Sequence, residues 1–358
     1  MNLFGWVLFL AFLGWAFERF YLRGPRQDHY PPPTDSESLQ HFSRPDGPGP
    51  AHQQVVRNVS ELSAGIAQSL QKSNIRAMRK AFDSISDGHE YDSLFTSCDA
   101  GGVPAEWVVA PGVSTDRRVL YIHGGGFLAG SPKSHRTITS QFSKVSGCAV
   151  LSIDYRMMPE YRIFNCVEDC RTAYRWILEN GPDGPGKIQQ LYIGGDSAGG
   201  KLTLSLLAWI RDNDLRAPEA AVVMSPLTDV TFSGDSVRKN LDTDVMLKPL
   251  VKPLVALPAF ARSWWVVWTY KVRPANPLVS PLLGDLSSLP PILVQASEAE
   301  ILLDDARRYV FKACASGSKT QLQTWSDMVH IWQIFYPELP QAAEAWGEIG
   351  KFLAKHRA

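Results

Sequence analysis

One serine stands out because glycines flank it on both sides at a fixed spacing. Residues 195–199 read Gly-Asp-Ser-Ala-Gly, which places Ser197 in a G-x-S-x-G pattern. The strand-like run "LYIGG" precedes the serine and the helix-like run "LTLSLLAWI" follows it. Small neighbours let a strand and a helix approach closely at a strained turn, which leaves the serine Oγ exposed. The pattern predicts a nucleophilic serine, with the N–H groups of the helix start favouring negative charge beside it.

A serine hydroxyl needs a histidine to take its proton and a carboxylate to orient that histidine. Of the eight histidines, only His330 lies between the last predicted strand and the last predicted helix. The acid should follow the strand predicted at 290–297, and the acidic residues found there are Glu298, Glu300, Asp304 and Asp305. The two aspartates belong to the next predicted helix, so the loop position favours Glu298 and Glu300. The order serine, acid, histidine is a known order for such a triad.

A glycine run follows another predicted strand. Residues 120–131 read "LYIHGGGFLAGS", and the three glycines let the backbone aim N–H groups into the site. With the N–H of Ala198 they can bind the oxyanion of a tetrahedral intermediate, where one donor lowers the barrier by about 3–4 kcal/mol. A phosphate-binding loop would need Lys and Ser or Thr directly after the glycines, where Phe127 and Leu128 stand. His123 is interpreted as an anchor of this loop rather than as a base.

Strand-like and helix-like segments alternate around these motifs. The strand-like runs are "AEWVVAP", "RVLYIHG", "CAVLSIDY", "QQLYIGG", "AAVVMSP" and "PPILVQAS". Strands separated by helices predict an α/β fold with a mainly parallel sheet covered on both faces. Residues 51–90 have helical periodicity, and residues 230–278 are too long and apolar for a simple crossover. Such insertions near strand ends commonly build a substrate pocket, and extra core packing is the alternative.

The N-terminal residues 1–23 form an apolar segment. Residues 3–17 carry no charge, and continued to Leu22 the segment reaches the roughly 20 residues that span a membrane. The arginines that follow would leave the remaining chain in the cytoplasm. We expect a membrane-associated protein, attached through residues 3–22. A lid helix packed on the body, or a signal sequence of a periplasmic or secreted protein, are the alternatives. Residues 24–50, rich in Pro, Ser and charge, predict a linker.

The composition narrows the classes of partner. The chain has 358 residues with 36 Lys and Arg against 36 Asp and Glu, so no basic excess indicates a nucleic-acid partner. Five cysteines are too few, and odd in number, for a disulfide scaffold. Cys166 and Cys170 have helical spacing but no further ligands at metal-site spacing, so we expect two semi-buried thiols. The sequence predicts no metal and no organic cofactor.

Together the motifs resemble the hormone-sensitive lipase family of α/β-hydrolases, which includes the bacterial family IV esterases. The resemblance covers about residues 90–358 and rests mainly on "HGGGF", "GDSAGG", "SPLTD" and "EILLDDA". It implies an α/β-hydrolase fold with Ser197 as nucleophile and His330 as base. It implies Glu300 as the acid, where the family usually has Asp. The oxyanion donors implied by the resemblance are Gly124, Gly125 and Ala198.

The resemblance also implies a helical cap. The cap would comprise residues 51–90 and an insertion at about 232–275 in a catalytic domain of residues 91–358. An apolar segment and linker before the domain are similar to the layout of membrane-anchored relatives of the arylacetamide deacetylase type. The tryptophans of the insertion would face lipid or a bulky acyl or aryl group, or would pack the cap: Trp264, Trp265 and Trp268. Family members often pair, so a homodimer is expected.

These observations predict a serine carboxylesterase that hydrolyses short- to medium-chain acyl or aryl esters, with a small-molecule ester as its partner. An amidase or deacetylase on the same triad is the alternative, because the same groups act if the leaving amine is protonated. A non-catalytic ligand receptor on the same fold is the third hypothesis. Such a receptor would be expected to have lost the base, whereas His330 is present.

Overall fold

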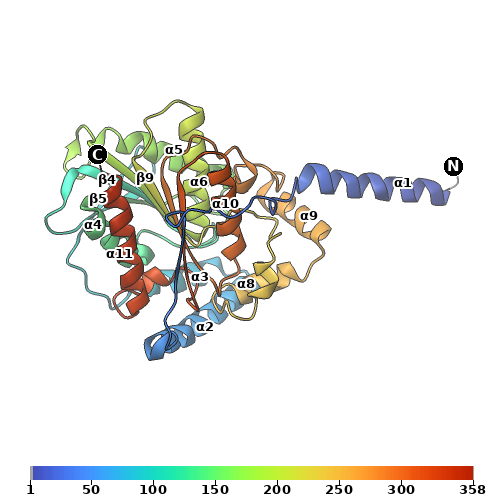
Figure 1. The fold of residues 1–358 in the computed structure, drawn as a ribbon, viewed down its shortest axis with the longest axis horizontal. Helices are drawn as coiled ribbons and strands as arrows, with labels where there is room; N and C mark the ends of the chain where they lie inside the picture. Colours follow the sequence, from blue (N-terminus) through green and yellow to red (C-terminus); the bar gives the residue numbers. More distant parts are fainter. Residues whose placement is uncertain (1–2, 358) are drawn as a thin grey trace.

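A nine-stranded sheet forms the centre of the protein in the computed structural model, which describes residues 3–357 (Figure 1). The strand order is β1-β11-β10-β9-β8-β4-β5-β3-β2. All pairs are parallel except β2 with β3 and β3 with β5. The strands span Leu39–Phe42 (β1), Leu94–Asp99 (β2), Pro104–Val109 (β3), Ser114–Ile122 (β4), Cys148–Ile153 (β5), Gln190–Asp196 (β8), Ala220–Met224 (β9), Ile292–Ser297 (β10) and Thr320–Trp325 (β11). A separate two-stranded hairpin pairs β6 (Asn180–Gly181) with β7 (Gly184–Pro185).

The six runs predicted as strands are β3, β4, β5, β8, β9 and β10, so the mainly parallel sheet is confirmed. The central strands are predicted readily from the sequence because both of their faces are buried. All side chains of β5 and β8 are inaccessible, and a parallel strand covered on both faces is apolar along nearly its whole length. Strands β1, β2 and β11 were not anticipated, since their sequences mix polar and apolar residues.

Helices cover both faces of the sheet. One face carries α5 (Ile163–Ile177), α6 (Ser197–Asp212) and α10 (Leu303–Ala315), whose apolar sides share one core. The other face carries α4 (Arg136–Ser146) and α11 (Pro340–Lys355), whose side chains form a second core with Tyr121 and Tyr192. The sheet is therefore the middle layer of three, as in Figure 1.

The predicted cap residues form two groups of helices. The first group is α2 (Gly49–Gln71), α3 (Ile75–Asp83) and the 3₁₀ turn η2 (Ser84–Ser86). The second is α7 (Ser236–Lys239), α8 (Lys248–Val255) and α9 (Ala259–Tyr270). Helix α2 contacts α8, and the Ser63 hydroxyl donates to the Met246 carbonyl. Two segments far apart in the sequence thus pack into one cover.

The N-terminal segment projects from the body as α1 (Leu3–Ala16), continued by a π-helical turn, η1 (Phe17–Leu22) (Figure 1). Residues Phe4–Leu22 are long and apolar enough to cross a membrane, and only 11% of that window is buried. Helix α1 is therefore no lid packed on the body. Contact with the body begins at η1, where Phe17 stacks on Trp264 and the Ser263 hydroxyl donates to Glu18.

Residues 24–50 do more than link α1 to the body. Within them β1 adds a parallel edge strand beside β11, and Phe42 stacks on Trp325 with ring centroids 4.2 Å apart. His41 Nδ1 also lies 2.9 Å from Thr324 Oγ1. A four-residue strand with half-exposed side chains has too little periodicity to be predicted, so the sequence indicated only a linker. Three further 3₁₀ turns complete the described elements: η3 (Lys133–His135), η4 (Pro281–Leu283) and η5 (Trp332–Phe335).

Candidate active site

Ser197 is the first residue of α6, directly after β8, and has a φ of +50°. Left-handed backbone is strained for a serine, and such strain concentrates at functional sites. The flanking glycines are required by close packing. A Cβ at Gly195 would lie 2.7 Å from the carbonyl oxygens of Gly199 and Ile122, and one at Gly199 would lie 2.0 Å from the Ile122 oxygen. The G-x-S-x-G pattern therefore allows β4, β8 and α6 to meet at this turn.

His330 and Glu300 are brought into direct contact. Glu300 follows β10 and His330 follows β11, and Glu300 Oε2 lies 2.5 Å from His330 Nδ1. The other carboxylate oxygen accepts from the Ser297 N–H at 2.8 Å. Among residues 3–357 no group hydrogen-bonds His330 Nε2, and this buried nitrogen belongs to a side chain that lines one pocket with Ser197.

The surroundings of His330 favour its protonated form. Burial lowers the pKa of His330, but the hydrogen bond and charge of Glu300, aided by Asp244, raise the pKa above its ordinary value. Asp244 was not identified from the sequence. Its carboxylate accepts from the Leu247 N–H at 2.8 Å and from the Ile301 N–H at 2.9 Å, so it joins the cap to the loop of the acid.

The other acidic candidates have different partners. Glu298 Oε2 accepts from Arg307 at 2.6 Å, and its side chain is partly exposed. Asp304 accepts from the Ser236 N–H at 2.7 Å. Asp305 accepts from backbone N–H groups that follow β9. Of the four acidic residues after β10, Glu300 is the one whose contact reaches His330.

The glycine run lies against the serine turn, but its first N–H is already used. Gly124 N donates to Asp196 Oδ1 at 3.0 Å, which corrects its assignment as an oxyanion donor. Gly125, Gly126 and Ala198 line the pocket beside Ser197. Gly125 has a φ of +109°, and a Cβ there would lie 2.0 Å from the Ala129 oxygen. The candidate donors are therefore the N–H groups of Gly125, Gly126 and Ala198.

His123 anchors the loop, as interpreted from the sequence. Its ring stacks on Tyr155 with centroids 4.4 Å apart, and Nδ1 lies 2.7 Å from the Gly124 oxygen. Burial and the neighbouring His135 lower the pKa of His123 to about 3, so the ring is neutral. The neutral His123 ring provides no charge to pair with Asp196. The nearest histidine to the Asp196 carboxylate is His135, whose Nε2 lies 3.4 Å from Asp196 Oδ2.

Asp196 is the residue of the serine motif whose role sequence reasoning missed. Its Oδ1 accepts from both the Tyr121 hydroxyl, at 2.6 Å, and the Gly124 N–H. The carboxylate is fully buried, and burial alone would raise its pKa, but His135 and these hydrogen bonds lower it below the ordinary value. A charged Asp196 thus ties the serine turn to the glycine loop. Its place beside the nucleophile was the only available signal.

The pocket above Ser197 is apolar and has a volume of about 280 Å³. Both groups of cap helices contribute to its wall, among them Leu62, Ile66, Phe82, Leu250, Leu254 and Trp265. Polar side chains are few in its lining: Ser197 and His330 at the base, and Ser63 and Tyr270 from the cap. Such a cavity holds a small apolar group against a reactive centre.

The structure offers no candidate metal centre in residues 3–357, since no three His, Cys, Asp or Glu side chains are grouped there to hold an ion. Cys166 and Cys170 are buried on α5, as the semi-buried interpretation expected. Burial raises the pKa of Cys166 to about 11, so this thiol is protonated.

A parallel sheet of this order, with a serine at a strand–helix turn and a histidine after the last strand, defines the α/β-hydrolase class. Residues 119–334 match the family described as the alpha/beta hydrolase fold, and the chain belongs to that family.

Named relatives narrow the class. The chain is 36% identical to an acetyl-hydrolase of Streptomyces hygroscopicus, over 71% of this chain and 80% of the relative. It is 33% identical to the carboxylesterase/phospholipase LipF of Mycobacterium tuberculosis, over 72% of this chain and 68% of the relative. A crystal structure of an esterase from the bacterial hormone-sensitive lipase family superposes with a TM-score of 0.75 at 34% identity. The superposition covers 86% of this chain and 98% of that esterase. The chain is an esterase of this fold similar to the bacterial hormone-sensitive lipase family, which confirms the resemblance.

Proposed function

We propose that this serine carboxylesterase hydrolyses short- to medium-chain acyl or aryl esters through an acyl-enzyme on Ser197. The relatives named carboxylesterase, esterase and acetyl-hydrolase support the reaction class. One observation carries the assignment of residues. Glu300 contacts one ring nitrogen of His330 at 2.5 Å, and His330 lines the pocket that Ser197 also lines.

The reaction proceeds in two halves. The Ser197 Oγ attacks the ester carbonyl while His330 Nε2 takes its proton, and the N–H groups of Gly125, Gly126 and Ala198 bind the oxyanion. The imidazolium then protonates the leaving alcohol, which departs as the acyl-enzyme forms. In the second half, His330 takes a proton from water, whose oxygen attacks the acyl carbon. The bond from that carbon to Ser197 Oγ then breaks, the imidazolium returns its proton to Oγ, and the acid is released. Glu300 orients the imidazole and stabilises its positive charge throughout.

The pocket supports the preference for short acyl groups. Its volume of about 280 Å³ lies near the lower end of the range for ligand pockets, roughly 300–1,000 Å³. An amidase or deacetylase would use the same residues, but the relatives favour ester substrates. The receptor hypothesis is disfavoured for the same reason.

Attachment to a membrane through residues 3–22 belongs to the same proposal, with the catalytic domain on the cytoplasmic side. The exposed apolar surface of α1 supports it, because such a surface needs to be covered. Exposed aromatic side chains on α9, including Trp264 and Trp268, extend that surface onto the body. A homodimer stays a prediction of the family resemblance.

Hydrolysis of p-nitrophenyl esters with two to sixteen acyl carbons tests the proposal, with the matching anilides as amide probes. We expect turnover to be highest for the short esters, to fall for the long ones, and to be negligible for anilides. The Ser197→Ala variant serves as the matched blank. Higher kcat/KM for the anilides, or equal ester turnover by Ser197→Ala, would contradict the proposal.

A further inference from the structure

A second cavity, with a volume of about 390 Å³, lies where η1 and the following residues meet the cap insertion and α10. Two aspartates, Asp229 and Asp235, contribute to its lining. Six arginines also line it: Arg19, Arg23, Arg26, Arg238, Arg262 and Arg308. We call this cavity the arginine pocket. Its excess of positive charge is local, because the whole chain has equal numbers of basic and acidic residues.

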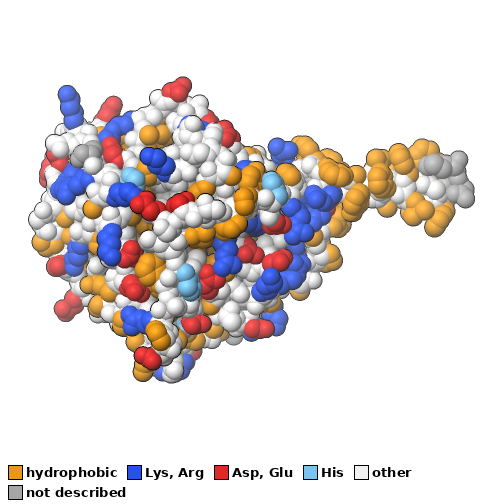
Figure 2. Space-filling model, viewed as in Figure 1, with side chains coloured by type: hydrophobic (Ala, Val, Ile, Leu, Met, Phe, Trp, Pro, Cys, Tyr) orange, Lys and Arg blue, Asp and Glu red, His pale blue; other side chains and the backbone are white. Residues whose placement is uncertain are grey.

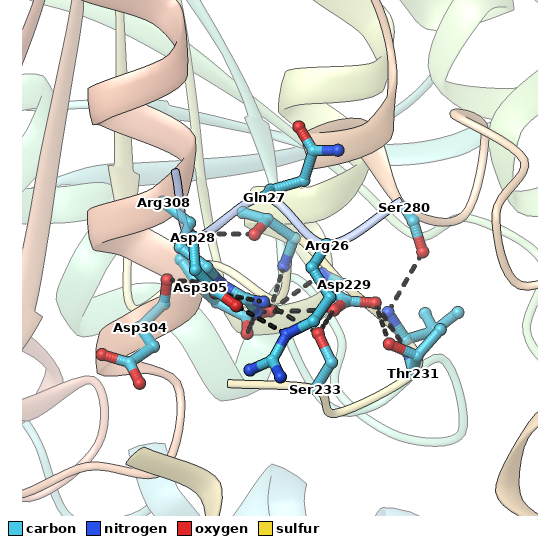
Figure 3. Close-up of polar contacts among 12 residues, drawn as sticks. Arg26, Gln27, Asp28, Asp229, Thr231, Ser233, Ser280, Asp304, Asp305 and Arg308 are labelled. Carbon is cyan, nitrogen blue, oxygen red and sulfur yellow. Dashed lines mark hydrogen bonds and ion pairs between the residues drawn. The ribbon is translucent and has the colours of Figure 1, made fainter. Parts of the chain in front are cut away.

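Part of this charge is neutralised within the protein. Arg308 is buried and donates to Asp229, Asp305 and Ser233, and Figure 3 shows these side chains gathered around one centre together with Arg26 and Asp28. Arg26 itself pairs with Asp28 at 2.7 Å. Arg23 pairs with Glu18 at 2.8 Å. Arg308 also pairs with Asp28 at 3.6 Å, and this contact joins the N-terminal segment to the body. Arg19 donates to the Gly24 oxygen, which leaves Arg238 and Arg262 to account for.

The side chains of Arg262 and Arg238 form no direct ion pair with a carboxylate among residues 3–357. Arg262 is only 4% exposed, yet its hydrogen bonds go to the backbone oxygens of Leu257 and Val255, and its Nε has no partner among residues 3–357. Arg238 is exposed, and its side chain forms no hydrogen bond or ion pair within the same residues. Burial lowers the pKa of Arg262 and the charges of Arg238 and Arg23 lower it further, while the charges of Asp229 and Glu18 offset only part of this decrease. A buried charge is costly unless it is paired, so this arrangement favours an anion in the cavity.

The position of the pocket indicates where the anion comes from. The pocket lies at the root of α1, and Figure 2 shows basic side chains gathered on the body beside the apolar arm. Arg19 and Arg23 lie at the end of the run of exposed apolar side chains, which reaches Tyr21. If α1 enters a bilayer, the pocket lies at the level of the lipid headgroups.

We propose that the arginine pocket binds the phosphate group of an anionic phospholipid. A guanidinium presents a planar fork of donors that matches phosphate oxygens, and Arg262 and Arg238 offer two such groups. The site is separate from the ester pocket, with which it shares no lining residue. The lipid source rests on the proposed membrane attachment, whereas recognition of phosphate does not.

Co-sedimentation of the full chain with vesicles tests the proposal. Vesicles of phosphatidylcholine, with and without phosphatidylglycerol, are compared for the wild type and for Arg238→Gln, alone and combined with Arg262→Gln. Because one basic side chain near an anionic lipid surface changes binding about fivefold, we expect about fivefold weaker binding to the anionic vesicles for each arginine removed. Arg238→Gln is the safer variant, since it removes an exposed side chain without partners.

The control variant Arg44→Gln/Arg57→Gln removes two positive charges, as the double pocket variant does. Both positions are exposed and neither lines the arginine pocket. It should bind anionic vesicles like the wild type. Equal losses in the control and in the pocket variants would overturn the proposal, because general surface charge would then explain binding. Hydrolysis of a soluble ester, measured in parallel, should be the same in all variants, which separates this test from that of the esterase function.

Inorganic phosphate distinguishes the sources of the anion. We expect it to raise the Tm of the wild type and not that of Arg238→Gln, since a ligand of the native state stabilises that state. This difference without preferential vesicle binding would support a phosphate site for a soluble ligand and overturn the lipid source. No difference between wild type and Arg238→Gln in either experiment would overturn the site itself.

Discussion

The ester site and the arginine pocket differ in whether their charged side chains have partners within the protein. In the ester site, both oxygens of Glu300 have donors, from His330 and from the Ser297 N–H. In the arginine pocket, three arginines are paired, but the Arg262 side chain hydrogen-bonds only to backbone oxygens and the Arg238 side chain has no hydrogen-bond or ion-pair partner within residues 3–357. A paired charge sets the proton affinity and orientation of its neighbour, whereas an unpaired charge is completed by a ligand. The difference teaches that one centre is built for chemistry and the other for binding.

Replacing the nucleophile should produce the largest effect. Ser197→Ala removes the oxygen that forms the acyl-enzyme, so kcat for a short p-nitrophenyl ester should fall by about 10⁶-fold. The pocket and its base stay in place, and KM should change little. Steady-state kinetics checks the result. A residual rate within about tenfold of the wild type would place the chemistry elsewhere.

Glu300→Gln breaks the pairing at the ester site and should lower kcat by about 10⁴-fold. It should also move the pH profile. Activity requires neutral His330, whose pKa is raised by Glu300, so kcat/KM of the wild type should rise with pH through a midpoint above 6.5. Loss of the carboxylate lowers that pKa, and the rise should shift to lower pH. Glu298→Gln is the matched control and should leave both rate and midpoint unchanged.

Asp196→Asn tests the attachment of the glycine loop to the serine turn. The amide oxygen can still accept from Gly124, but the charge opposite His135 is lost. The loss in kcat should therefore be a fraction of the roughly 10²- to 10³-fold that removal of one oxyanion donor costs. An unchanged kcat would show that the loop holds its position without this charge.

Lys201 is a third case: a buried, unpaired cation that does not line the arginine pocket. It is fully buried on α6, its Nζ has no hydrogen-bond partner among residues 3–357, and it lies 4.1 Å from the centroid of Phe127. Burial lowers its pKa from 10.5 to about 8. Lys201 lines neither the arginine pocket nor the ester pocket, so its charge should only destabilise the fold.

Lys201→Met should raise the free energy of unfolding at pH 7 by about 2–3 kcal/mol, since one pKa unit corresponds to about 1.4 kcal/mol and the Phe127 contact offsets part of the shift. The unfolded state binds the proton more tightly, so the stability of the wild type should increase between about pH 8 and 10.5. The variant should lack that increase. Urea unfolding across this pH range measures both effects, and a less stable variant at pH 7 would contradict the account.

The sequence predicts those features that depend on local pattern. The buried strands are continuous apolar runs, and Ser197 is set by glycines two positions away on either side. Strands β1 and β11 escape this reasoning because polar side chains interrupt them, and their pairing joins residues at opposite ends of the chain. The same limit applies to the donor role of Gly124, since its partner Asp196 lies 72 positions further on. The roles of Asp244 and Arg262 could not be predicted either, because they depend on tertiary contacts.

The most direct test of the central claim is covalent labelling by an organophosphonate, with the modified residue located by mass spectrometry. If His330 activates Ser197, the wild type should carry one label, on Ser197, and His330→Ala should label far more slowly. Arg238→Gln should label like the wild type, because the arginine pocket takes no part in the reaction. Labelling of another residue, or equal rates for the wild type and His330→Ala, would contradict the assignment of this site.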